Sequence, residues 1–273
     1  MRVELELQSP GDLLVDIGAL RPSEVLSRLP GEIEKLSVLV AGRPSALGEH
    51  FKIVISEGGR DELVLRGATR RLVSAGRRME SGRLRIEGEA GPFIGAEMSG
   101  GELEVFGNAG DCLGMSMCGG LLRVHGSAGD WCGASQPGQA KGMTGGALIV
   151  DANVGIETGA GMRRGLLVIG GDSGEYPGVR MLAGTILCMG RLGAGAGLEM
   201  KRGSLVAGSS GALLPGFRPA GEADSEWLLI TLALLHRLRL PCQQAWDRRS
   251  PKRFSGDHLV TGKGEVLVYD ILE

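Results

Sequence analysis

The stretch of sequence that decides the fold is GPFIGAEMSGGELEVFGNAGDCLGMSMCGGLLRVHGSAGDWCG, from Gly91 to Gly133. It holds two copies of one pattern, in which a Met is followed by Gly three residues later, Leu five residues later and Val seven residues later. The copies begin at Met98 and Met117, so the pattern repeats after 19 residues. A short, fixed period rich in glycine is typical of a solenoid, in which each repeat forms one coil of a continuous stack.

The same pattern continues on both sides of this stretch. Seven methionines, each with a Gly three residues later, are spaced 19, 19, 26, 19, 19 and 19 residues apart: Met79, Met98, Met117, Met143, Met162, Met181 and Met200. The apolar residues that alternate after each Gly indicate strand rather than helix. Nineteen residues at about 3.3 Å each give a perimeter of roughly 60 Å, enough for three short strands and three corners.

We therefore predict an all-β fold, a right-handed parallel β-helix of about seven to eight coils over residues 61–210. Equivalent residues of successive coils would lie about 4.8 Å apart. The methionines would then form one ladder inside the stack, where a flexible thioether fits an irregular cavity. The single 26-residue coil contains ASQPGQAKG, Ala134 to Gly142. We expect this insertion to leave the coil as a loop.

Two flanking segments complete the predicted organisation: residues 1–60 as an N-terminal capping segment, and residues 211–273 as a C-terminal helix and extended arm. Within the first segment, residues 2–7 alternate charged and apolar side chains and predict a strand. Residues 21–29 predict a short helix, and residues 51–56 predict a second strand. A cap of this kind would cover the open backbone edge of the first coil.

In the second segment, a helix is predicted from Ser225 to about Arg239, with Asp224 as its N-cap and Pro241 as its stop. We expect it to cap the far end of the coils. Its predicted apolar side consists of Trp227, Leu228, Ile230, Leu234, Leu235 and Leu238. Residues 248–273 have no evident partner in the coil repeat, so we expect an arm that contacts a neighbouring subunit.

The composition excludes several classes of protein. The chain has 273 residues and a net charge of -2 with both signs mixed along it, so no nucleic-acid footprint is present. The longest apolar run, Trp227 to Leu235, is too short to span a bilayer. The five cysteines form no C-x-x-C pair, and no set of cysteines and histidines has the spacing of a zinc site, so we predict no metal site, reduced thiols and a cytoplasmic protein. They are Cys112, Cys118, Cys132, Cys188 and Cys242.

One pair of residues is a candidate for catalysis. Asp111 and Asp130 occupy equivalent positions in successive coils, a spacing that resembles the carboxylate pairs of polysaccharide-cleaving enzymes. No His, Lys or third carboxylate stays in phase with them, which favours corner aspartates that bind backbone N–H groups. His125 and His258 have no legible nucleophile as partner, so we expect structural or surface roles for both. We therefore predict no catalytic residue in this chain.

Basic residues form the one candidate binding feature. Arg163–Arg164 and Lys201–Arg202 occupy the same two positions after their methionines, two coils apart, and Arg77–Arg78 precede Met79 at an adjoining corner. One interpretation is a solvated corner that keeps the solenoid soluble. The other is a docking strip for an acidic partner or an anionic, polyglutamyl carrier tail, whose attraction would weaken with salt.

At the level of families, the 19-residue coil resembles the β-helix shared by the C-terminal domain of glutamate synthase large subunits and by the C subunit of formylmethanofuran dehydrogenase. Three further stretches resemble this C subunit rather than glutamate synthase: LGEHF at residues 47–51, PGQAKGM at 137–143 and RFSGDHLVTGKGEVLV at 253–268. The family has two branches, a molybdenum or tungsten dehydrogenase of methanogens and a metal-free formyltransferase/hydrolase complex of methylotrophic bacteria. Arg outnumbers Lys 24 to 6, which favours the bacterial branch.

The resemblance implies a non-catalytic, structural role in one-carbon metabolism. Its implied partners are the hydrolase (A), the B and the formyltransferase (D) subunits of the same complex, and it implies no cofactor bound by the chain itself. Formyl groups would pass from formyl-tetrahydromethanopterin through a methanofuran-like carrier and leave as formate. Three alternatives stay open: the methanogen dehydrogenase, a glutamate-synthase-like domain, and an autonomous polysaccharide-cleaving enzyme that uses Asp111 and Asp130.

Overall fold

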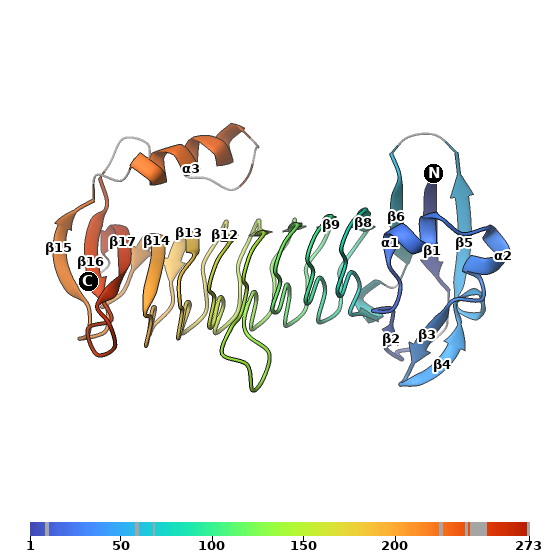
Figure 1. Ribbon diagram of the computed structural model, residues 1–273, viewed down its shortest axis with the longest axis horizontal. Coiled ribbons are helices and arrows are strands. Elements are labelled where there is room, and N and C mark those ends of the chain that lie inside the picture. The colour runs from blue at the N-terminus through green and yellow to red at the C-terminus, as the bar shows by residue number, and fades with distance from the viewer. Residues whose placement is uncertain are drawn as a thin grey trace.

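The computed structural model describes residues 1–8, 11–57, 60–67, 69–223, 226–237, 240 and 250–271. Its strands lie side by side along one long axis and form a solenoid with a more compact unit at each end (Figure 1). The coil repeats contribute β8 Arg83–Ile86, β9 Glu102–Val105, β10 Leu121–Val124, β11 Ala147–Val150, β12 Leu166–Ile169, β13 Thr185–Leu192 and β14 Arg202–Ser210. The predicted all-β solenoid is therefore confirmed.

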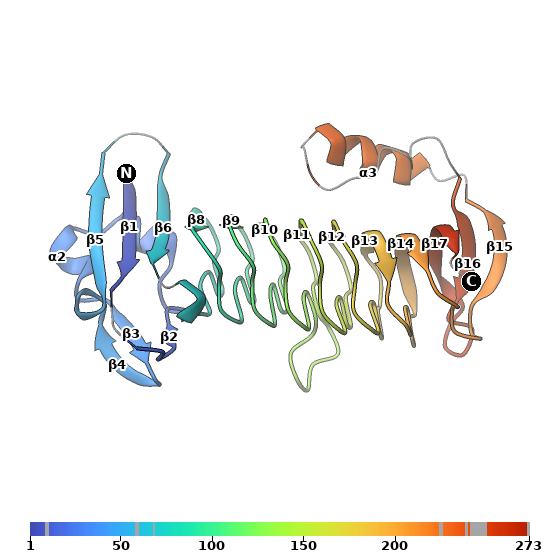
Figure 2. The same ribbon diagram turned by 180° about the vertical axis from the view of Figure 1, so that it is seen from behind.

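The coil strands are parallel, and their register follows the sequence repeat. Leu103 lies beside Leu84 on one side and Leu122 on the other. The longer coil keeps the same register, because Leu122 pairs with Leu148 across it. The seven extra residues form a loop that projects from the stack below β11 (Figure 2). As predicted, the insertion leaves the sheet undisturbed.

The structure explains why each coil methionine is followed by a glycine. All seven coil methionines are at most 1% exposed. The methyl carbon of each packs against the glycine of the next coil: a Cβ on Gly120 would lie only 2.7 Å from Cε of Met98, and a Cβ on Gly146 only 2.9 Å from Cε of Met117. These glycines also adopt positive φ, +84° and +83°, which L side chains rarely adopt. The predicted methionine ladder is confirmed, and the glycines make room for it.

One detail of the prediction is wrong. The coil perimeter predicts three strands in each coil, but each coil from β8 to β14 holds one strand. The other walls of these coils are turns linked to the neighbouring coils by backbone hydrogen bonds and single bridges. The reason is local conformation. At one corner of five successive coils a non-glycine residue adopts positive φ, which interrupts the extended chain. These residues are Phe93, Cys112, Trp131, Glu157 and Tyr176.

The N-terminal segment continues the coil sheet instead of forming a separate layer. β1 (Arg2–Leu7) pairs with β6 (Glu62–Gly67) in parallel and with β5 (Phe51–Ser56) antiparallel, and β6 pairs with β8. Val3 and Leu5 are fully buried, as their alternation predicts. The smaller elements of this segment are β2 Val15–Asp16, α1 Pro22–Leu26, α2 Pro30–Ile33, β3 Ser37–Val40, β4 Arg43–Ala46, η1 Leu47–Glu49, η2 Thr69–Arg71 and β7 Leu72–Val73. β4, β3, β2 and β7 form a second sheet in that order.

The C-terminal segment corrects the prediction of a free arm. β17 (Lys263–Ile271) pairs in parallel with β14 over its length, and Gly264 lies beside Gly203. A Cβ on Gly264 would lie 2.6 Å from Cε of Met200, so this glycine receives the last methionine of the ladder. β16 (Lys252–Gly256) and β15 (Arg218–Glu222) then close the sheet in antiparallel fashion. The tail thus has an intramolecular partner, the last coil.

The predicted C-terminal helix is α3 (Glu226–Arg237). It lies along the outer face of the sheet rather than over its end (Figure 1). Its buried residues are Leu228, Leu232 and Leu235, which pack on the outward side chains of β11 to β14 and β17. Trp227, Ile230 and Leu234, predicted on the apolar side, are 37%, 70% and 49% exposed. Asp224, Leu238, Arg239 and Pro241 lie outside the described residues.

The outward column of the sheet explains where α3 rests. In β8, β9 and β10 this column holds Arg85, Glu104 and Arg123, whereas from β11 onward it holds Ile149 and then Val168. The helix covers only the apolar part, because removal of apolar surface from water favours burial there. No helix in the described part of the chain is long and apolar enough to cross a membrane.

Candidate functional site

The candidate catalytic aspartates are part of a hydrogen-bonded ladder between coils. Oδ1 of Asp111 accepts a hydrogen bond from the backbone N–H of Asp130 at 2.9 Å, and Oδ1 of Asp130 accepts one from Ile156 at 2.9 Å. An adjacent column, three residues earlier in each coil, does the same: Oδ1 of Asn153 accepts a hydrogen bond from the N–H of Asp172 at 2.8 Å, and Oδ1 of Asp172 accepts one from the N–H of Arg191 at 2.7 Å. Asparagine in the same role shows that a carbonyl-type oxygen is sufficient, so the ladder needs no ionisable group. The geometry favours the structural interpretation over a carboxylate pair that acts on a polymer.

This ladder also accounts for a second column of glycines. A Cβ on Gly129 would clash with Oδ1 of Asp111, and a Cβ on Gly155 would clash with Oδ1 of Asp130. Neither glycine adopts positive φ. Here glycine is needed for close approach, since the side chain of the preceding coil occupies the space of a Cβ.

The described cysteines are free thiols, and three of the four are buried. Burial, with a smaller contribution from the charges of Asp111 and Asp130, raises the pKa of Cys112 to about 11. Burial likewise raises the pKa of Cys132 and of Cys188 to about 12. Thiols with such pKa values stay protonated at neutral pH and are poor nucleophiles and ligands. Cys242 lies outside the described residues, among which no cluster of His, Cys, Asp and Glu fits a metal ion.

The two candidate histidines are in different environments. His125 stacks on Phe106 with ring centroids 4.6 Å apart, and its Nδ1 lies 3.1 Å from Oδ2 of Asp151. It belongs to the charged outer face of the sheet. Nε2 of His258 lies 3.2 Å from Oγ of Ser255 in an exposed turn, a pair that was not predicted from the sequence. Neither histidine lies beside a cysteine or a metal cluster in the described part of the chain.

The basic strip divides into two parts. Arg77 and Arg78 both bind the carboxylate of Glu97, each at 2.9 Å. Burial alone would raise the pKa of Glu97, but the hydrogen bonds from Arg77 and Arg78 outweigh it and lower that pKa. Much of the positive charge at this corner is therefore matched within the chain.

The other part of the strip is unmatched. Backbone N–H groups of Arg163 and Lys201 donate to the carbonyls of Met143 and Met181, both at 2.8 Å, which places the two residues at the same corner two coils apart. Arg163, Arg164, Lys201 and Arg202 are exposed, and none forms an ion pair with a described residue. The register of β14 and β17 adds Lys263 beside Arg202.

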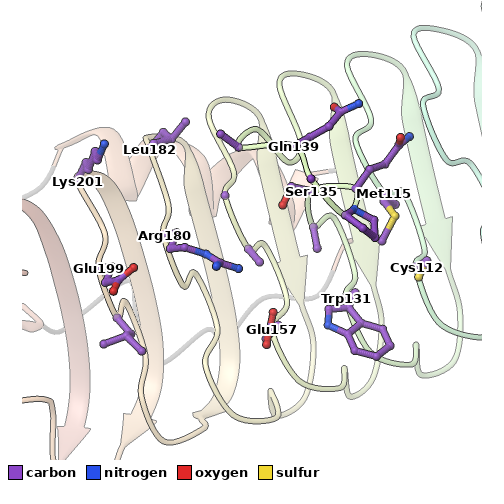
Figure 3. Close-up of a pocket in the computed structure, with 18 of the residues that line it drawn as sticks. Cys112, Met115, Trp131, Ser135, Gln139, Glu157, Arg180, Leu182, Glu199 and Lys201 are labelled. Carbon is purple, nitrogen blue, oxygen red and sulfur yellow. The ribbon is translucent and has the colours of Figure 1, made fainter.

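A groove of about 1020 Å³ adjoins this unmatched part (Figure 3). We call it the corner groove. One end is formed by the insertion loop and Trp131, with Phe93, Cys112 and Met115 of the two preceding coils. The other end is formed by Leu259 and Val260 in the turn between β16 and β17. Between them the walls carry Glu157, Arg180, Leu182, Leu198, Glu199 and Lys201. The groove was not predicted from the sequence, although the insertion loop that forms one end was.

The floor of the corner groove is apolar and already packed. Ala134, Ala160 and Leu198 line it and pack with Val179 in a small cluster outside the main core, in which the two alanines and Val179 are at most 8% exposed. At the ends, Trp131 is 38% exposed and Leu259 is 82% exposed. The arrangement leaves the ends of the groove as its uncovered apolar surface.

The comparison with solved structures places this geometry in a known assembly. The chain matches a chain in the X-ray crystal structure of the formyltransferase/hydrolase complex FhcABCD from Methylorubrum extorquens in complex with methylofuran, with a TM-score of 0.88 and 33% sequence identity. The match covers 97% of this chain and 98% of that chain. The chain belongs to the family of the subunits of this formyltransferase/hydrolase complex. No protein-family model and no curated protein sequence matches it.

Membership of the FhcABCD family confirms the resemblance at the level of the complex. It associates the chain with an enzyme complex of several subunits, and the neighbour's bound methylofuran associates that complex with one-carbon chemistry. The Asp ladder and the protonated thiols are buried or bonded within the stack of coils. The corner groove and the unmatched cations are exposed at its surface.

Proposed function

We propose that this chain is the C subunit of a formyltransferase/hydrolase complex, a structural component without catalytic residues that organises the other subunits. Its proposed partners are the hydrolase (A), the B and the formyltransferase (D) subunits. On those subunits, formyl groups pass from formyl-tetrahydromethanopterin to a methanofuran-like carrier and leave as formate. The observation that carries the proposal is the match to a FhcABCD chain over nearly the full length of both chains.

The chemistry of the described residues supports a structural role. The residues considered as catalytic candidates have roles in the fold: Asp111 and Asp130 accept hydrogen bonds from backbone N–H groups of the next coil, and Cys132 is fully buried. A rigid stack of coils can hold partner subunits at fixed separations, which is what transfer of one group between distant sites requires. Free thiols fit a reducing compartment, so we place the complex in the cytoplasm.

Within this proposal, the unmatched cations are the contact for an anionic partner or for the polyglutamyl tail of the carrier. Arg77 and Arg78 already bind Glu97 and are less available for such a contact. The better candidates for this contact are therefore Arg163, Arg164, Lys201 and Arg202. The match to the transferase/hydrolase complex favours this branch over the molybdenum or tungsten dehydrogenase of methanogens.

The test is purification of the tagged chain from its host, beside the chain expressed alone. The proposal expects co-purification of the A, B and D subunits and formate release from formyl-tetrahydromethanopterin by the complex. The isolated chain should bind no formyl donor productively and release no formate. Formate release by the isolated chain, or failure to recover the other subunits from the host, would refute the proposal.

A further inference from the structure

The corner groove differs from the rest of the solenoid surface in its charge. At the equivalent edge of the first coils, Arg77 and Arg78 are paired with Glu97. The charged residues that line the groove are the exposed cations Arg180 and Lys201 and the acidic residues Glu157, Glu199 and Asp257, of which Asp257 is buried. Three more exposed cations lie on the adjoining edge of the solenoid: Arg163, Arg164 and Arg202. None of these eight side chains forms an ion pair with a described residue. The excess of positive charge therefore comes from the edge that flanks the groove, where Arg163, Arg164 and Arg202 are exposed, and it favours a negatively charged occupant.

The geometry of the groove sets the size and shape of that occupant. From the insertion loop to the β16–β17 turn the groove crosses four coil spacings, or roughly 19 Å at about 4.8 Å each. An extended chain of about six residues spans this length. Both ends project to the same side of the stack (Figure 1), so the occupant would lie along the solenoid axis. In Figure 3 the side chain of Arg180 extends across the groove toward the coil of Glu157.

The two ends require apolar groups on the occupant. Leu259 is 82% exposed, yet its backbone is fixed: its N–H donates to Oδ1 of Asp257 at 2.9 Å, and Oδ2 of Asp257 accepts from the N–H of Glu199 at 3.2 Å. Asp257 itself is 1% exposed. Trp131 at the other end is of the residue type most enriched among the anchors of protein interfaces. Leu259 adds an exposed apolar side chain whose position is fixed by its turn.

We propose that the corner groove is the docking site for an extended segment of a partner subunit, with apolar side chains against Trp131 and Leu259 and carboxylates between them facing Arg180 and Lys201. This inference rests on the proposed function, because it takes the occupant from the same complex. A polyglutamyl chain would pair with the cations but would leave both apolar ends of the groove exposed. A protein segment that carries both apolar and acidic side chains therefore fits the groove better. The insertion loop then acts as one of the two walls that fix where the segment lies.

The first experiment locates the occupant. A benzophenone amino acid replaces Gln139, which is exposed on the insertion loop, in the chain co-expressed with the other subunits. The matched control carries the same group at Lys35, which is exposed in the N-terminal unit and lies outside the groove. We expect illumination of the purified complex to join Gln139→benzophenone, and not the control, to one partner peptide that contains acidic residues flanked by apolar ones. Crosslinks to the carrier, to a second copy of this chain, or equally at both positions would overturn the inference.

The second experiment measures the contribution of the two kinds of contact. Leu259→Ser removes an exposed anchor, and Lys201→Glu reverses a cation; their controls are Leu13→Ser and Lys52→Glu, both exposed in the N-terminal unit. We expect each groove variant to fold with an unchanged circular dichroism melting curve and to weaken assembly by about tenfold or more. Only the effect of Lys201→Glu should shrink at high salt.

The outcomes separate this inference from the proposed function. If the wild-type chain does not assemble with the A, B and D subunits, the proposed function fails. If it assembles and the groove variants assemble as tightly as their controls, the proposed function stands and the corner groove is not the docking site.

Discussion

The packing of each methionine against the next coil's glycine predicts a measurable coupling between the two. Gly184 is the mildest case along the ladder, because a Cβ built there would lie 3.1 Å from Cε of Met162 and 3.4 Å from the nearest backbone atoms of Arg164. Its φ is +99°. Gly184→Ala therefore combines two costs, the strain of an L residue at positive φ and a crowded contact with a methyl group.

Each cost can be estimated separately. Positive φ costs an L residue about 1–2 kcal/mol, and overpacking of a filled core adds about 1–3 kcal/mol. Gly42→Ala isolates the first cost, because Gly42 has φ +78° and no atom within 4 Å of its Cβ position. We expect Gly184→Ala to lower the free energy of unfolding by about 1 kcal/mol more than Gly42→Ala does.

The companion substitution is Met162→Leu, which removes the Cε that Gly184 receives. Alone it should cost under about 1.5 kcal/mol, since the volume is nearly conserved. In the double variant the alanine at position 184 no longer meets a methyl group. The combined cost should therefore fall below the sum of the single costs by about 1 kcal/mol, within the range found for residues in contact.

The assay is urea unfolding followed by far-ultraviolet circular dichroism for the wild type, the three single variants and the double variant. Equal slopes with denaturant would show that all variants unfold the same structure. Costs that add to within about 0.5 kcal/mol would refute the reasoning, because the methionine methyl group would then not be what excludes a side chain from position 184.

Three further predictions concern other parts of the stack. Asp130→Ala should lower the free energy of unfolding by about 1 kcal/mol, whereas Asp130→Asn should change it little, and urea titration compares them. Removal of residues 250–273 should expose Met200 and an unpaired strand edge, so we expect a lower melting temperature and aggregation; a monomeric truncated protein with unchanged melting would contradict this. At neutral pH, iodoacetamide should label exposed Cys118 but not Cys132, whose pKa burial raises to about 12, as mass spectrometry can show.

The sequence predicts the coils well because stacking repeats the same environment at every period. Once Met98 and Met117 are recognised as equivalent, the register of β9 and β10 and the burial of both methionines follow. The repeat does not identify β17 in this way. Gly264 occupies the glycine position of the repeat, but Thr261 occupies the position of the methionine. Because each repeat is recognised by its methionine, the tail is not recognised as a repeat and is predicted to be an arm. In the structure the tail forms the next layer of the stack.

Features that depend on contacts between distant segments are harder to predict. α3 is apolar on nearly all sides, so its own periodicity does not select the face that is buried. The change from Arg123 to Ile149 in the outward column of the sheet is the signal that could have located it. The corner groove depends on where the insertion loop and the β16–β17 turn end relative to each other. The conformation of the turn depends on contacts of Asp257, one of which joins it to Glu199 in the preceding coil.

The contact between Met200 and Gly264 has a consequence for how such chains can change in length. The closing unit receives the last methionine in the same way that one coil receives the methionine of the coil before it. A whole repeat can therefore be added or removed while the contact between methionine and glycine at each end of the stack stays the same. Each such step would move the terminal units by about 4.8 Å. The number of repeats thus determines the length of the solenoid. Insertion or deletion of 19 codons could therefore change the distance between partner proteins bound at its two ends.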